Sequence, residues 1–233
     1  MYEHPVIRLS DVRKDYMLGQ TKVEALRGVS LAVDKGEFLA IAGPSGSGKS
    51  TILNMIGCID TPTSGTILIN GRDVSGLSDQ ELTRYRRVTV SFIFQSFNLI
   101  PVLDVYENIE LPLLLQGNKD AKDRRSRVMH LIGEVELSDR IKNKPGELSG
   151  GQRQRVAIAR ALAANPLMVL ADEPTANLDS TTGAKILDLM RTINSRDGTT
   201  FVFSTHDSRI MERAQRIISI KDGLIMDDVR KGA

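Results

Sequence analysis

The stretch GPSGSGKS, residues 43–50, decides what kind of fold this chain adopts. It follows a short apolar run, Glu37–Ala42, and precedes a helix-like run, Lys49–Cys58. Its spacing fits the pattern G-x-x-x-x-G-K-[ST] of a phosphate-binding loop between a strand and a helix. Gly46 and Gly48 allow the backbone to curl so that N–H groups and the helix N-terminus face a phosphate. A chance glycine turn with a solvated lysine would not explain the strand and helix on either side.

Side chains in this loop are suited to bind a nucleotide. Lys49 is placed to neutralise the β- and γ-phosphates, and the Ser50 hydroxyl is placed to bind Mg²⁺. The residues that we predict to bind the nucleotide here are Gly43, Pro44, Ser45, Gly46, Ser47, Gly48, Lys49, Ser50 and Thr51.

Two acidic residues follow a second apolar run, Leu167–Ala171. Asp172 ends this run, so we expect its carboxylate at the sheet edge beside the phosphate loop, where it can hold Mg²⁺ directly or through water. Glu173 lies one residue further, where it can polarise a water molecule aimed at the γ-phosphate. Alternatively, Asp172 and Glu173 could simply be a polar strand end before a turn at Pro174. The presence of a phosphate loop in the same chain makes this interpretation the weaker one.

A second glycine-rich stretch, LSGGQ at residues 148–152, has no obvious partner in its own half of the chain. Ser149 is a good helix N-cap, and Gly150 and Gly151 permit close approach of another backbone. The helix-like run Gly150–Ala164 would aim its positive end at an anion. Considered alone, this stretch is an ordinary capped helix start. Together with the phosphate loop and the Asp-Glu pair, it indicates a second phosphate-contacting element.

Composition limits the classes of protein to which the chain can belong. Its 233 residues, 41% hydrophobic and 26% charged, are typical of one soluble globular domain that carries a smaller subdomain. A net charge of +2 argues against indiscriminate nucleic-acid binding, and we expect no nucleic-acid partner. The single cysteine, Cys58, suits a reducing compartment and is expected to be a buried apolar group. Because we find no secretory signal and no apolar run near ~20 residues, we expect a cytosolic chain.

Strand-like and helix-like runs alternate along the chain and predict an α/β fold. The expected strands are Ile7–Tyr16, Val23–Val33, Glu37–Ala42, Thr66–Ile69, Val90–Phe94, Leu167–Ala171, Phe201–Ser204 and Arg216–Lys221. The expected helices are Lys49–Cys58, Asp104–Leu115, Asp120–Val135, Gly150–Ala164 and Ser180–Arg196. Helices dominate the middle of the chain. We therefore expect one domain, 1–233, with a helical subdomain at 95–165 between two parts of a nucleotide-binding core at 1–94 and 166–233.

In this order, the motifs resemble those of the ATP-binding-cassette (ABC) superfamily over essentially the whole chain. The resemblance makes residues 43–50 the Walker A loop, Leu148–Gln152 the signature, and Leu167–Asp172 the Walker B strand. The roles that it implies for single residues are adenine stacking by Tyr16, sensing of Mg²⁺ and water by Gln95, catalysis by Glu173, a D-loop position for Asp179, and a switch role for His206. If the resemblance to this family is set aside, Tyr16 could be a strand tyrosine, Gln95 a surface amide and His206 a structural histidine.

The resemblance implies a P-loop NTPase fold of the ABC ATPase kind, with a parallel sheet, an antiparallel β-subdomain and an inserted α-helical subdomain. It also implies ATPase activity, with ATP and Mg²⁺ as cofactors. The implied catalytic residues are Glu173, His206, Lys49 and Gln95, and the implied metal residues are Ser50, Gln95 and Asp172. The further residues implied in nucleotide binding are Tyr16, Ser149, Gly150, Gly151, Gln152 and Asp179.

The family also implies partners. Two cassettes are expected to form a head-to-tail homodimer, with ATP held between the phosphate loop of one copy and the signature of the other. A separate membrane permease is expected, which would place the chain at the cytoplasmic face of the bacterial inner membrane. Residues 95–101, 107–113 and 171–179 look most like the subfamily that serves macrolide export and lipoprotein release. The permeases of that subfamily have few spans and large periplasmic domains, which implies contact with periplasmic or outer-membrane components.

Other classes use parts of this motif set. Chromosome and repair ATPases carry a long coiled coil between the Walker motifs, whereas the intervening stretch here has no sustained heptads. Translation-type cassette proteins usually carry two cassettes in one chain. A GTPase would need Asn-Lys-x-Asp, and NKPG at residues 143–146 lacks the carboxylate. An ABC-type ATPase that regulates a non-transport membrane or chromosome-associated complex stays open as the alternative, while Glu173 and His206 argue against a cassette that binds without hydrolysis.

Overall fold

The structure is a computed structural model that describes residues 5–231. Its central layer is a six-stranded sheet in the order β10-β9-β3-β8-β7-β6, in which only β10 is antiparallel to its neighbour. The strands are β3 (Phe38–Ala42), β6 (Val90–Ile93), β7 (Met168–Asp172), β8 (Thr200–Thr205), β9 (Arg216–Lys221) and β10 (Leu224–Arg230). Because β3, β7 and β8 are covered on both faces, all their residues except Asp172 are buried, and their central residues are apolar without alternation.

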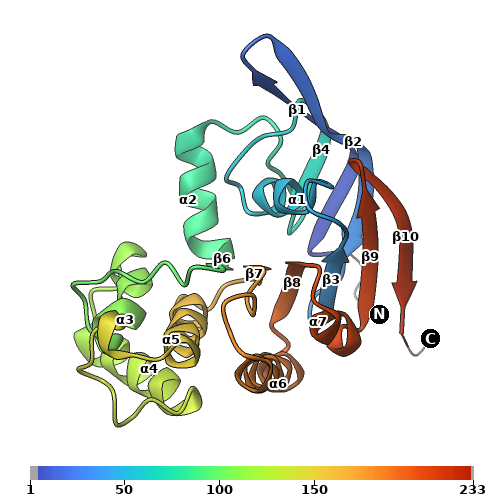
Figure 1. Ribbon diagram of the computed structural model, residues 1–233. Coiled ribbons are helices and arrows are strands. Elements are labelled where there is room, and N and C mark those ends of the chain that lie inside the picture. The colour runs from blue at the N-terminus through green and yellow to red at the C-terminus, as the bar shows by residue number, and fades with distance from the viewer. Residues whose placement is uncertain (1–4, 232–233) are drawn as a thin grey trace.

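One face of the central sheet is covered by a smaller antiparallel sheet and a helix (Figure 1). The small sheet has the order β2-β1-β4-β5, and its strands are β1 (Ile7–Leu18), β2 (Thr21–Val33), β4 (Ser64–Ile69) and β5 (Arg72–Asp73). Helix α1 (Lys49–Ile56) lies between the two sheets, and α2 (Asp79–Thr89) leads into β6. Apolar side chains of both sheets and of α1 form one continuous core.

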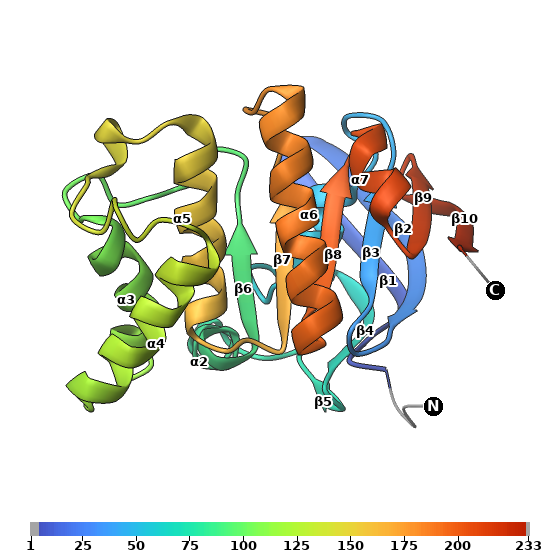
Figure 2. The ribbon, with the colours of Figure 1, turned by 90° about the horizontal axis from the view of Figure 1, so that it is seen from below.

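The remaining helices pack on the opposite face and beside the β6 edge (Figure 2). They are α3 (Val105–Leu115), α4 (Ala121–Glu134), the 3₁₀ turn Pro145–Glu147, α5 (Gly150–Ala163), α6 (Ser180–Asp197) and α7 (Ser208–Arg213). Alternate residues of β3, β7 and β8 face this second core, as the pleat requires. Among residues 5–231, no helix combines the length and apolar character needed to cross a bilayer.

Every strand and helix expected from the sequence is present, with ends displaced by at most two residues. For example, β3 begins at Phe38 rather than Glu37, and α1 ends at Ile56 rather than Cys58. The expectation missed α2, α7, β5 and β10. The Asn70-Gly71 turn joins β4 to β5, and both residues have positive φ, as a tight hairpin requires.

The Cys58 thiol is expected to be unreactive in the folded protein. Cys58 is 1% exposed, and desolvation by burial raises the pKa of its thiol from 9.0 to about 11. A disulfide reagent at pH 8 should therefore react slowly with the native chain and rapidly in urea, because thiolate is the attacking species. Between pH 9 and about 11 the unfolded thiol loses its proton before the folded one does. Stability should therefore fall over this window. Equal reaction rates for native and unfolded chain would contradict this prediction.

Candidate active site

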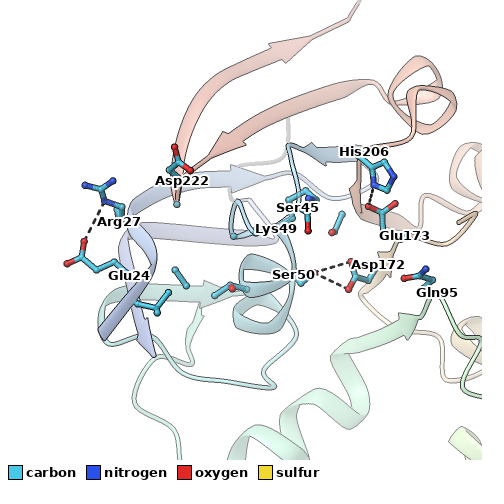
Figure 3. A pocket seen from close by; sticks show the side chains of 17 residues that line it. Glu24, Arg27, Ser45, Lys49, Ser50, Gln95, Asp172, Glu173, His206 and Asp222 are labelled. Carbon is cyan, nitrogen blue, oxygen red and sulfur yellow. Dashed lines mark hydrogen bonds and ion pairs between the residues drawn. The ribbon is translucent and has the colours of Figure 1, made fainter. Parts of the chain in front are cut away.

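An open pocket of about 640 Å³ lies at the carboxyl ends of the parallel strands β3, β7 and β8 (Figure 3). This edge of an open parallel sheet is where ligands bind in α/β proteins. The sequence-predicted residues that line the pocket are Ser45, Gly46, Gly48, Lys49, Ser50, Thr51, Gln95, Asp172, Glu173 and His206. The fold therefore brings together side chains that lie far apart in the sequence.

The loop between β3 and α1 has the conformation that its glycines predict. Gly46 and Gly48 have φ values of 77° and 104°, in the left-handed region that favours glycine. Lys49 is only 7% exposed, and its Nζ donates to the carbonyl oxygens of Gly43 (2.9 Å) and Pro44 (2.8 Å). The ammonium group of Lys49, the first residue of α1, is thus held by two carbonyls at the start of the loop.

The turn between β9 and β10 packs against this loop and is hydrogen-bonded to it. The Gly223 N–H donates to the Ser47 carbonyl at 3.0 Å. A Cβ on Gly43 would lie 2.1 Å from the Ile220 carbonyl oxygen, so only glycine fits there. Gly43 is therefore required by packing against β9, and it does not line the pocket.

Ser50 and Asp172 form the part of the pocket that suits a metal ion. The Ser50 hydroxyl lies 3.3 and 3.2 Å from the two carboxylate oxygens of Asp172, which ends β7 (Figure 3). In the part of the chain that the structure describes, no three His, Cys, Asp or Glu side chains cluster as a metal site. Mg²⁺ that binds with nucleotide phosphates needs only one or two protein ligands, so this sparse arrangement fits it.

Two buried hydroxyl groups add to this fit. Within residues 5–231, Ser47 Oγ and Ser204 Oγ have no hydrogen-bond partner, although Ser47 is 2% exposed and Ser204 is 0% exposed. Such groups are uncommon and indicate places where an ion, a water molecule or a ligand completes the bonding. Ser204 lines the pocket and pairs with Asp172 across neighbouring strands.

Glu173 and His206 lie together at the end of the pocket opposite the β9–β10 turn (Figure 3). Glu173 has a φ of 46°, and its backbone N–H donates to the Ser204 carbonyl at 2.9 Å. Its Oε1 is 2.6 Å from His206 Nδ1, and its Oε2 is 3.2 Å from the Thr205 hydroxyl. The carboxylate is 16% exposed and the imidazole 72% exposed. A shielded carboxylate beside an open imidazole is suited to proton transfer with a bound water molecule.

Of two further predicted residues, Gln95 lines the pocket and Tyr16 does not. Gln95 lines the pocket, and its carbonyl oxygen accepts a hydrogen bond from the Asn177 amide at 2.9 Å. Tyr16 is not among the pocket-lining residues. Its hydroxyl donates to the Asp60 carboxylate at 2.9 Å, and the Lys14 ammonium lies 5.0 Å from the ring centroid.

The signature residues and Asp179 lie outside the pocket. Ser149 and Gln152 form a capping box at the start of α5, in which each side chain bonds the backbone N–H of the other. Asp179 caps α6 by accepting from the Thr182 N–H at 2.9 Å. A Cβ on Gly151 would lie 2.5 Å from the Thr182 side chain. The N-termini of α5 and α6 are therefore neighbours, away from the phosphate loop of the same chain.

Sequence reasoning missed several residues that line the pocket. They are Val23, Glu24, Ala25 and Arg27 from β2, Ser204 from β8, and Asp222 and Gly223 from the β9–β10 turn. The Asp-Gly pair is a recognisable turn signal. Nothing local in the sequence of β2 indicates that it approaches the phosphate loop.

Comparison with known proteins agrees with this fold. The family model described as "ABC transporter" matches residues 26–176. The chain is 50% identical over 221 residues to the ABC transporter ATP-binding protein MJ0796 of Methanocaldococcus jannaschii, covering 94% of each. It is 45% identical to the lipoprotein-releasing system ATP-binding protein LolD of Anaeromyxobacter dehalogenans, covering 96% of the chain and 94% of LolD. It is 47% identical to the macrolide export protein MacB of Brucella melitensis, but spans only 35% of that protein.

Solved structures of ATP-binding cassettes are also similar to this chain. The structure described as a dimeric, post-hydrolysis state of the MJ0796 cassette bound to ADP and Pi has a TM-score of 0.89. Its sequence identity is 46%, over 97% of this chain and 99% of that one. The chain belongs to the ABC transporter family. It is an ATP-binding domain of that family and an ATPase, with relatives in the MacB and LolD groups.

Proposed function

We propose that the chain hydrolyses Mg²⁺-ATP between two head-to-tail copies and so drives a separate membrane permease of the macrolide-export or lipoprotein-release type. The observation that carries this proposal is the position of the signature. Ser149 is exposed at the start of α5, outside the pocket that holds Lys49 and Glu173. A helix N-terminus offers N–H donors to a phosphate, and here a second copy would supply that phosphate. Two solved structures of the MJ0796 cassette are described as dimeric, which supports the pairing of two copies.

The proposed roles follow the geometry of the pocket. Lys49 would meet the β- and γ-phosphates, Ser50 and Asp172 would hold Mg²⁺, and Gln95, which lines the same pocket, would sense the metal and the attacking water. Glu173 accepts the proton of that water, and His206 contacts the γ-phosphate. In the partner copy, Ser149, Gly150, Gly151, Gln152 and Asp179 complete the site. ATP would then hold the dimer closed, and hydrolysis would open it.

We further propose a docking cleft for the permease where a helical subdomain (95–165) meets the core (1–94 and 166–233). A cavity of about 530 Å³ lies between α2, β6, α3 and α5. It is lined by Phe92 and Phe94, whose rings stack 5.4 Å apart, and by Leu111 and Leu115. Leu115 is 61% exposed, so the cleft presents apolar surface to solvent. An apolar helix of a permease at the cytoplasmic face would bury it. Periplasmic or outer-membrane components would then be reached only through the permease.

Leu115→Asp tests the docking cleft. We expect the amount of permease that co-purifies with the variant from native membranes to fall by at least about tenfold. The reason is that a charge would be buried in an apolar contact. Binding of a fluorescent ATP analogue should be unchanged, since Leu115 lies outside the nucleotide pocket. The matched control is Val229→Asp, which changes an apolar side chain on β10 that is 47% exposed. Mass spectrometry should identify a few-span membrane protein. Equal recovery with both variants would contradict the docking site.

A further inference from the structure

Two loops that enter the pocket side by side are joined by a pair of crossed hydrogen bonds. One loop follows β7 and carries Glu173 and Thr175, and the other begins at the end of β8 and carries Thr205 and Asp207. The Thr205 hydroxyl donates to Glu173 Oε2 at 3.2 Å, and the Thr175 hydroxyl donates to Asp207 Oδ2 at 2.9 Å. Each loop thus supplies one threonine and one carboxylate, two residues apart.

The direction of the bond to Glu173 is fixed by its neighbours. Thr205 Oγ1 also accepts the backbone N–H of Asp207 at 2.9 Å. A hydroxyl has a single hydrogen, and an ionised carboxylate can only accept. The hydrogen of Thr205 therefore points at Glu173. Thr205 is 0% exposed and Thr175 is 1% exposed, so water does not compete for these bonds.

The Asp207 carboxylate is also bound by Arg209. Arg209 Nη2 donates to Asp207 Oδ2 at 2.6 Å, and Arg209 Nη1 donates to the Ser180 carbonyl at 3.3 Å. The hydrogen bonds from Arg209 lower the pKa of the Asp207 carboxyl to about 2, so it stays charged at neutral pH. Asp207 and Arg209 therefore tie the loop after β8 to the first turn of α6, beside Asp179.

We propose that Thr205 and Asp207 are positioning residues that hold the Glu173 carboxylate by Oε2, so that Oε1 stays directed at the pocket. Without this bond the carboxylate would be held only at Oε1, by the exposed His206 imidazole, and the terminal torsion of a glutamate rotates broadly when it is not fixed on both sides. Asp207 acts through its backbone N–H, which fixes the Thr205 hydroxyl, and through its carboxylate, which fixes Thr175. This inference rests on the proposed role of Glu173 as the base.

Steady-state ATPase measurements on the full chain with Thr205→Val test the proposal. Valine keeps the shape of threonine but removes the hydroxyl. We expect kcat to fall by about tenfold to a hundredfold, because small misplacements of a reacting group have effects of this size. The KM for ATP should change less than about twofold, since Thr205 is not among the pocket-lining residues. Thr205→Ser restores the donor and should bring kcat back to within about threefold of the native value.

Thr200→Val is the matched control. Thr200 lies at the opposite end of β8, is 0% exposed, and its hydroxyl likewise accepts a backbone N–H, from Gly36 at 2.9 Å. Both valine variants lose a buried hydrogen bond, but only Thr205→Val should lower kcat. If Thr205→Val folds poorly, Asp207→Ala, which removes the acceptor of the Thr175 hydroxyl, gives a second measurement, with a lower kcat and an unchanged KM expected.

A double-variant experiment separates this proposal from the role of Glu173. In a Glu173→Gln background, adding Thr205→Val should change the residual kcat less than about twofold, because the positioning bond then has no base to orient. If Glu173→Gln alone leaves kcat intact, the assignment of the base is wrong. If Glu173→Gln is slow but Thr205→Val turns over normally, raises KM instead, or slows both backgrounds equally, the positioning role is overturned.

Discussion

Replacing Glu173 with glutamine is expected to lower ATP turnover by about 10²–10⁴-fold, the usual contribution of a general base. Glutamine has nearly the same shape and can still meet His206 and Thr205, which lie 2.6 and 3.2 Å from the carboxylate oxygens. It cannot take a proton from water. Phosphate release at saturating Mg²⁺-ATP measures the effect. Glu212→Gln, on an exposed position of α7, is the control and should keep the native rate.

The same variant should accumulate as an ATP-bound dimer. Because hydrolysis no longer removes the γ-phosphate, the contacts proposed between that phosphate and Ser149 of a second copy persist. Size-exclusion chromatography with light scattering should show the mass of one chain without nucleotide and of two chains with Mg²⁺-free ATP. A monomer under both conditions would contradict the head-to-tail model, even if turnover is lost as expected.

The sequence predicted the central architecture because its decisive signals are local. Glu37–Ala42 is apolar throughout, as a strand covered on both faces must be, and residues 43–50 are marked by their glycines. The helix starts were also predictable, because caps such as Ser149 act within one turn. Element ends moved by one or two residues where helix turns fray or strands extend beyond their apolar part.

The missed elements have weak local signals. Helix α2 is strongly polar and buries only Leu82 and Thr89, so it has no apolar stripe that predicts a helix. Its capping box, formed by Ser78 and Glu81, was the available signal. Strand β10 lies at the sheet edge and is largely exposed, so its residues do not follow a regular alternation.

Some pocket residues could be predicted from local sequence, whereas others reach the pocket only through tertiary packing. Lys49, Asp172 and Glu173 follow strand ends in the sequence, and parallel strands place such ends on one edge. Arg27 comes to the pocket only through the packing of β2, which no short motif encodes. The crossed bonds of Thr205 and Asp207 likewise depend on two loops meeting, so they became visible only in three dimensions.

Lys49→Ala is expected to weaken ATP binding by about a hundredfold. The lysine is 7% exposed, and in this structure its ammonium group contacts the Gly43 and Pro44 carbonyls beside the pocket. A hundredfold loss corresponds to about 2.7 kcal/mol, and hydrogen bonds to charged groups contribute roughly 1.5–3 kcal/mol each, so one or two such bonds to phosphate oxygens account for it. Titration with a fluorescent ATP analogue measures it, and turnover should be undetectable at ordinary ATP concentrations because little nucleotide is bound.

The control must separate loss of the phosphate contact from collapse of the loop. Alanine also removes the two bonds to Gly43 and Pro44, so the melting temperature of the nucleotide-free variant has to be compared with that of the native chain. Lys35→Ala, in the exposed turn before β3, removes a lysine at the other end of the same strand and should keep native affinity. A variant that melts normally yet binds ATP as tightly as the native chain would show that Lys49 does not contact the phosphates. The loop would then bind through its backbone N–H groups alone.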